Sequence, residues 1–94
     1  MAITRINEFR AVPTKSDALR EFLSSVIATI KESPGCLACD LFIDHEDNTR
    51  FAIVESWEDV AAHRSAATRI PPAKLAEVQP LLAEPPKGRY YQPA

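Results

Sequence analysis

The sequence predicts an α+β fold with one antiparallel sheet, and three observations predict it. Segments with alternating apolar residues lie near both ends of the chain and as a pair at its centre. Between the first of them and the central pair, apolar residues recur every three or four positions, which is the period of an amphipathic helix. Proline, alone or beside glycine, ends most of the segments, because neither residue continues a helix readily, and a polar turn over residues 44–49 separates the central pair. We expect the 94 residues to form a single domain, residues 1–94.

The first half of the chain is predicted to hold a strand, a helix and a second strand. Residues 2–12 alternate imperfectly and predict the first strand. The spacing from Thr14 to Asp17 is that of a capping box, so a helix is expected to begin there and to end at the Pro-Gly pair before residue 36. Residues 36–43 alternate and predict the second strand.

The second half repeats this order. Residues 50–57 predict a third strand, which pairs with the second as a hairpin. A helix is expected to follow at once, with Ser56 as its N-cap and Asp59 completing a capping box. Residues 73–83 predict a short, irregular helical segment, and residues 87–92 predict the last strand, with one of its two tyrosines on each face. The order β-α-β-β-α-(short α)-β is that of a ferredoxin-like split βαβ sandwich.

The two sides of the third strand differ in character. Phe51, Ile53, Glu55 and Trp57 share one side, and small residues share the other, which we expect to lie under the helices. The side with Glu55 and Trp57 would then suit a cleft or a subunit contact. On the following helix, His63 falls on the apolar stripe and is expected to face inward. Helices would cover only one face of the sheet, so we expect a homodimer in which two sheets pack face to face.

Composition argues against several classes of partner. The 11 basic and 13 acidic residues are intermixed and give a formal charge of -2, so no broad basic field is present to attract nucleic acid or an anionic membrane. No apolar run approaches the roughly 20 residues that cross a bilayer, and the first residues lack the apolar region of a signal peptide. We therefore expect a cytoplasmic protein that binds neither nucleic acid nor membrane.

The two cysteines, Cys36 and Cys39, form a C-x-x-C pair within the second predicted strand. An odd separation in a strand places the two side chains on opposite faces, and the chain has no second pair of ligands to complete a zinc site. We interpret them as reduced structural thiols. His45 lies in an acidic turn and reads as a solvated residue, so no metal site is expected.

Four short segments stand out by their order and spacing. They are Pro34-Gly35-Cys36-Leu37, Arg50-Phe51 leading into Val54-Glu55-Ser56-Trp57-Glu58, Ala62-His63, and Ala83-Glu84-Pro85-Pro86. Together they resemble the antibiotic biosynthesis monooxygenase (ABM) family over almost the whole chain. The resemblance implies a dimeric α+β barrel that oxidises a small electron-rich aromatic, of quinol or anthrone type, with dioxygen. It implies no metal, flavin or haem cofactor, since a deprotonated quinol or anthrone can itself donate an electron to oxygen.

The implied pocket lies between the sheet and the helices. His63 is the first candidate for a catalytic base, because an imidazole with a pKa of about 6.5 accepts a proton at neutral pH, although it can equally be a core residue. Trp57 could stack on a planar ligand or anchor the core, and Asn7 could orient a ligand oxygen or face solvent or a partner. Glu55 could act as a base or pair with an arginine such as Arg5. The residues expected to bind substrate are Phe42, Phe51, Glu55, Tyr90 and Tyr91.

Two other functions stay open at this point. Haem-degrading relatives combine a strand asparagine, a tryptophan and an axial histidine. This chain has Asn7 and Trp57, but it has Ala67 about one turn after His63, where the resemblance places the axial histidine. A non-catalytic dimer that binds a small ligand would use the same fold without turnover, because a fold alone does not fix a function.

Overall fold

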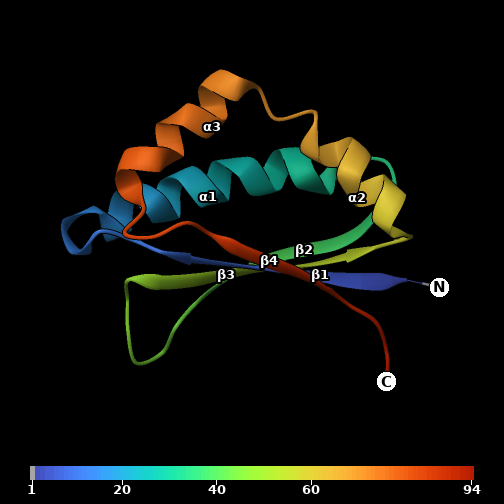
Figure 1. Ribbon diagram of the computed structural model, residues 1–94, viewed down its shortest axis with the longest axis horizontal. Helices are drawn as coiled ribbons and strands as arrows, with labels where there is room; N and C mark the ends of the chain where they lie inside the picture. Colours follow the sequence, from blue (N-terminus) through green and yellow to red (C-terminus); the bar gives the residue numbers. More distant parts are fainter. Residues whose placement is uncertain (1) are drawn as a thin grey trace.

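In the computed structural model, which describes residues 2–94, an antiparallel sheet carries all the helices on one face (Figure 1). Met1, which the expected domain includes, lies outside the described residues. The strands are β1 (Ile3–Arg10), β2 (Cys36–Ile43), β3 (Arg50–Trp57) and β4 (Lys87–Tyr91), and the helices are α1 (Ser16–Lys31), α2 (Val60–Ala67) and α3 (Pro72–Val78). The strand order is β2-β3-β1-β4, so the predicted ferredoxin-like α+β fold is confirmed.

The register of β3 decides which side chains lie under the helices. Phe51, Ile53, Glu55 and Trp57 are all buried, with at most 4% of any of them exposed, and they face α1 and α2. The expectation that the small side of this strand lies under the helices is therefore wrong. The physical reason is volume, because the space between a sheet and its helices fills to interior density only when large side chains enter it.

The apolar stripe of α1 supplies the other half of the core. Leu19 and Leu23 are 0% and 2% exposed, and they join Phe51 and Ile53 in the main hydrophobic cluster. Burial of one leucine side chain contributes about 1.5–3 kcal/mol, so this stripe holds α1 against the sheet. Figure 1 shows α1 lying along the sheet.

A β-bulge in β2 overturns the prediction that Cys36 and Cys39 lie on opposite faces of the sheet. Cys36 and Ala38 pair with adjacent residues of β3, so Leu37 is the extra residue between them. The bulge shifts the alternation by one position, and Cys36 and Cys39 both lie on the helix side of the sheet. Both cysteines are free, and Cys39 is 1% exposed. Burial raises the pKa of Cys39 to about 12.

Helix α2 begins three residues later than the capping prediction. Ser56 stays in the sheet, and the N-cap is Asp59, whose Oδ1 accepts from the Ala62 N–H at 2.8 Å. The reason is that β3 is paired on both sides as far as Trp57, so the chain cannot leave the sheet at Ser56. The capping box predicted at Thr14 and Asp17 is not formed either. A 3₁₀ turn over Pro13–Lys15 precedes α1, and no side chain caps the helix.

The last part of the chain follows the prediction closely. Helix α3 is continued by a 3₁₀ turn over Gln79–Leu81, which gives the short, irregular segment expected around Pro80. In β4, Tyr90 pairs with Arg5 and Tyr91 with Thr4, so the two tyrosines face opposite sides of the sheet as predicted. Among residues 2–94, we find no helix with the length and apolarity that crossing a membrane requires.

The face of the sheet away from the helices is uncovered (Figure 1). Alternation places Phe42 of β2 and Tyr91 of β4 on it, and these side chains are 55% and 49% exposed. Of the paired candidates Phe51 or Phe42 and Tyr90 or Tyr91, the structure places Phe51 and Tyr90 on the helix side, and Phe42 and Tyr91 lie one position out of phase with them.

Candidate functional site

A cavity of about 330 Å³ lies between the sheet and the three helices. Its volume is at the lower end of the range of about 300–1,000 Å³ that small-ligand pockets occupy. Most of the wall is apolar and includes Phe9, Phe22, Leu23, Val26, Ile53 and Val78. Asn7, Glu55, Trp57 and His63 supply polar groups from neighbouring positions on β1, β3 and α2. The cavity therefore has an apolar body and a polar end.

Glu55 stands at the centre of the polar end and is 2% exposed. Its Oε1 accepts a hydrogen bond from the Trp57 indole N–H at 2.7 Å, and its Oε2 accepts one from the Asn7 amide at 2.9 Å. Burial raises the pKa of Glu55 above its usual value, while the two hydrogen bonds and the charge of Arg5 offset part of that rise. The result is a buried carboxyl group that is more basic than one in water.

Arg5 and Gly88 orient the Asn7 amide. Arg5 lies directly across from Glu55 in the register, as a cross-strand pair would, but its Nε donates to Asn7 Oδ1 at 3.1 Å. Its guanidinium carbon also lies 4.6 Å from the centre of the Tyr90 ring. Gly88 makes room for this arrangement, since a Cβ there would overlap the guanidinium. With Oδ1 held by Arg5, the Asn7 amide nitrogen is directed at Glu55.

His63 reaches the polar end from α2 and faces inward, as its place on the helix stripe predicts. Its Nδ1 lies 2.6 Å from the Tyr90 hydroxyl, and its Nε2 lies 3.9 Å from Glu55 Oε1. The ring meets those of Trp57 and Tyr90 edge to face, at centroid distances of 5.4 and 5.2 Å. Burial, and then the charges of Arg5 and Arg64, lower the pKa of His63, so the imidazole is neutral at pH 7.

The structure thus brings together five of the residues that the sequence singled out: Asn7, Glu55, Trp57, His63 and Tyr90. Phe51 belongs to the hydrophobic core and does not line this cavity. Ala67, where the haem-degrading relatives would need a ligand, lines the cavity with a methyl group. Within residues 2–94, no group of three or more His, Cys, Asp or Glu side chains is arranged to hold a metal ion.

Sequence reasoning missed the apolar wall and the role of Gly88. The apolar stripe on α1 identified the side chains that face the sheet. It did not show that a cavity remains between these side chains and those of the sheet. A glycine in an edge strand gives no sign that an arginine from the neighbouring strand fills the space above it.

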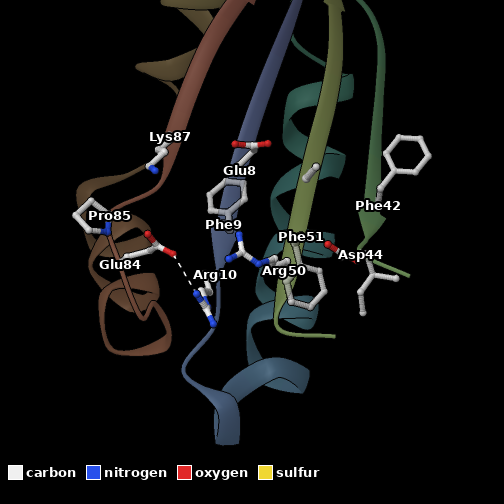
Figure 2. Close-up of a pocket in the computed structure, with 12 residues that line it drawn as sticks. Glu8, Phe9, Arg10, Phe42, Asp44, Arg50, Phe51, Glu84, Pro85 and Lys87 are labelled. Atoms are coloured by element: carbon white, nitrogen blue, oxygen red, sulfur yellow. Dashed lines mark ion pairs between the residues drawn. The ribbon is translucent and has the colours of Figure 1, made fainter. Parts of the chain in front are cut away.

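A second hollow, of about 440 Å³, lies beside the hairpin end of the sheet (Figure 2). Charged side chains of both signs border it in equal number: Arg10, Arg50 and Lys87, and Glu8, Asp44 and Glu84. Arg10 and Glu84 approach each other to 4.0 Å across it. The balance of charge favours neither an anion nor a cation as a ligand, which separates this hollow from the cavity under the helices.

The fold and the cavity can be compared with those of known protein families. The family model described as antibiotic biosynthesis monooxygenase matches residues 2–69. The chain belongs to the ABM family. The matched part includes Asn7, Glu55, Trp57 and His63, so most of the polar end of the cavity lies within the family domain. At the level of the family, the protein is grouped with monooxygenases. A comparison with curated protein sequences finds no match.

Solved structures share the fold of this ABM protein over nearly its whole length. PA3566 from Pseudomonas aeruginosa is 28% identical, with a TM-score of 0.84 over 99% of this chain and 95% of that one. Rv0793 from Mycobacterium tuberculosis is 22% identical, with a TM-score of 0.86 over 100% and 96%. SnoaB from Streptomyces nogalater, described as a cofactor-independent oxygenase, is 15% identical, with a TM-score of 0.81 over 98% and 92%. At such identities, the last two show a common fold and no more.

Proposed function

We propose that this ABM protein is a cofactor-independent monooxygenase that oxidises a small electron-rich aromatic, of quinol or anthrone type, with dioxygen. The observation that carries the proposal is the cavity, which is apolar over most of its wall and holds a carboxyl group and an imidazole at one end. A planar ring system would bury its faces against the apolar wall and bring its acidic O–H or C–H bond to the polar end.

The chemistry needs a base and a dry site. For an anthrone, removal of one C–H proton leaves a carbanion that donates an electron to dioxygen, and the resulting radical and superoxide combine into a peroxide. Protonation of the peroxide and loss of water then turn the CH₂ group and O₂ into C=O and H₂O. Burial of the reacting anion strengthens its interactions with fixed dipoles and keeps bulk water from quenching it.

Each residue at the polar end has a place in this scheme. His63 and Glu55 are the two groups that could accept the proton, and both line the cavity. Trp57 holds the carboxylate by its indole N–H and presents its ring to the substrate, and the Asn7 amide orients a substrate oxygen. We assign His63, Trp57 and Asn7 to catalysis, Tyr90 to the positioning of His63, and Glu55 to the binding and deprotonation of the substrate.

We also propose that a second copy of the chain covers the open face of the sheet, which gives a dimeric α+β barrel. The charges around the second hollow are balanced, so two copies related by a twofold axis can set basic groups against acidic ones. Phe42 and Tyr91, both about half exposed, would be buried by the same contact.

Oxygen uptake tests the proposed function. Metal-free protein is mixed with a reduced naphthoquinol or an anthrone, and the rate is compared with spontaneous oxidation. We expect uptake above that background, and a loss of at least about tenfold, or roughly 1.4 kcal/mol of transition-state stabilisation, in His63→Ala. His45→Ala, which removes the exposed histidine of the hairpin turn, is the matched control and should keep the full rate. No acceleration with any such substrate would refute the proposal.

A further inference from the structure

The position of the proton on His63 determines which group in the cavity can act as a base. Its Nδ1 lies 2.6 Å from the Tyr90 hydroxyl oxygen. The two atoms are within hydrogen-bond distance, so either the tyrosine O–H donates to a bare Nδ1 or an Nδ1–H donates to the hydroxyl oxygen. A phenol O–H is a stronger donor than a neutral imidazole N–H, and an imidazole lone pair is a stronger acceptor than a phenol oxygen, which favours the hydroxyl of Tyr90 as donor and Nδ1 of His63 as acceptor.

The second ring nitrogen indicates the same tautomer. His63 Nε2 lies 3.9 Å from Oε1 of Glu55, which is buried and already accepts from Trp57. A proton on Nε2 is attracted by that carboxylate oxygen, whereas a lone pair on Nε2 would be repelled by it. The contacts at Nδ1 and at Nε2 come from different strands, β4 and β3, and both select the form that carries its proton on Nε2.

We propose that Tyr90 and Glu55 hold neutral His63 in the Nε2–H tautomer, and that Glu55 rather than His63 takes the proton from the substrate; the second part rests on the proposed function. In this tautomer the Nδ1 lone pair is occupied by Tyr90 and Nε2 has none, so the imidazole is a hydrogen-bond donor toward the cavity. A carboxylate has about four lone-pair sites, of which Trp57 and Asn7 use two.

The proton step is then fully assigned. A substrate O–H or C–H bond breaks, its electron pair stays on the substrate, and a new O–H bond forms on Glu55. The Nε2–H of His63 remains available to donate to the oxygen atom on which negative charge develops. His63 in this role stabilises an anion and moves no proton.

The charged and titratable groups around Glu55 fit a base at this position. Arg5 comes from β1, Tyr90 from β4, and Cys39 lies directly across from Glu55 on β2. The thiol of Cys39 is neutral, and Arg5 acts through Asn7 rather than in direct contact with the carboxylate. Burial raises the pKa of Glu55 toward the working pH, which is what a general base at neutral pH requires.

Nuclear magnetic resonance of nitrogen-labelled histidine tests the tautomer without any need for turnover. Long-range proton–nitrogen correlations distinguish the protonated ring nitrogen from the bare one. We expect His63 in the wild type to carry its proton on Nε2, and Tyr90→Phe, which removes the hydroxyl donor, to let the Nδ1–H form appear. Tyr91→Phe alters the neighbouring tyrosine on the opposite face and should change nothing. A wild-type His63 protonated on Nδ1 would overturn the proposal.

Turnover then separates the donor from the base. Glu55→Gln still accepts hydrogen bonds but cannot take a proton, so we expect its kcat to fall by about 100-fold or more. His63→Gln keeps an N–H donor and should lose less than about tenfold. A loss of about 100-fold in His63→Gln would overturn the proposal whatever Glu55→Gln does. Glu46→Gln, at an exposed turn, is the control.

Failure of the two proposals can be told apart. If the wild type does not accelerate oxygen uptake with any substrate, the proposed function fails and the base role of Glu55 fails with it. The resonance spectra still decide the tautomer in that case, because they report on the resting protein.

Discussion

A methyl group at Gly88 tests whether the polar end of the cavity is held as the structure shows. The Cβ of Gly88→Ala would overlap the Arg5 guanidinium, lying 2.6 Å from its Cζ and 2.5 Å from Asn7 Oδ1. Contacts this short essentially never occur at real Cβ atoms, so Arg5 must move. We expect it to lose both its hydrogen bond to Asn7 and its place over the Tyr90 ring.

The expected magnitude follows from the terms that compete. Without a clash, Gly→Ala stabilises a protein by about 0.4–1 kcal/mol, because alanine restricts the unfolded chain. Here the lost hydrogen bond to Arg5 costs about 1.5–3 kcal/mol, as expected for a charged donor. The lost stacking on Tyr90 adds about 0.5–1 kcal/mol. We therefore expect Gly88→Ala to lower the free energy of unfolding by about 1–3 kcal/mol, a fall in Tm of roughly 4–8 °C for each kcal/mol.

A double-mutant cycle isolates the cause. In an Arg5→Ala background the new Cβ would still lie 2.5 Å from Asn7 Oδ1, but that amide is no longer held by Arg5 and can turn away, so Gly88→Ala should be clearly less destabilising there. Urea unfolding followed by the fluorescence of Trp57 measures all four proteins, since this tryptophan lies in the same network. If Gly88→Ala is as destabilising without Arg5 as with it, or if it stabilises the wild type, the guanidinium does not occupy that space and the reasoning is refuted.

Three further predictions concern the open face, the titrating groups and the thiols. Phe42→Asp places a charge on the uncovered face and should convert a dimer into a monomer in light scattering, whereas Phe42→Leu should not; a monomeric wild type would contradict the proposed dimer. Burial raises the folded-state pKa of Glu55, so the folded state holds more protons above the unfolded-state pKa and stability should fall as pH rises through the folded-state value. Burial lowers the folded-state pKa of His63 instead, so the unfolded state binds more protons below about pH 6.5, and the free energy of unfolding should fall as pH falls through that range. Urea titrations over pH should show the first effect vanish in Glu55→Gln and the second in His63→Gln. With its pKa at about 12, Cys39 in a Cys36→Ser variant should react with a disulfide reagent only after unfolding, and fast reaction of the native protein would count against its burial.

Much of the fold could be predicted from the sequence because its periodicities are strong and its breaks are marked by proline, by glycine or by a polar turn. The alternation could not show which side of each strand points toward the helices. The two sides of β3 were separated correctly, but the large side lies under the helices because only it has the volume to meet Leu19 and Leu23. The bulge at Leu37 leaves no mark in the pattern of residues, and so the prediction placed Cys36 and Cys39 on opposite faces.

The candidate site was predictable in its members more than in its contacts. The helix stripe directed His63 inward, and the strand pattern put Glu55 and Trp57 on one side. The partner of Glu55 depended on the register, which the sequence does not supply. Arg5 does lie across from Glu55, but its guanidinium bonds to Asn7, which is paired with Ile53. Only the diagonal relation between β1 and β3 brings the Asn7 amide to the carboxylate.

Glu55 is the residue that core packing explains least. Taking a carboxylate out of water costs several kcal/mol, and each hydrogen bond to it contributes about 1.5–3 kcal/mol in return. Its two direct donors, Trp57 and Asn7, are neutral, and the charge of Arg5 acts from behind Asn7. An apolar side chain at this place would extend the row formed by Phe51 and Ile53 at lower cost. The charged residues around the second hollow, by contrast, include partly solvated ones such as Arg10 and Glu84, for which ionisation costs little. An ionisable group retained in the interior at such a cost, at the end of an apolar cavity, is characteristic of a site that uses its proton affinity.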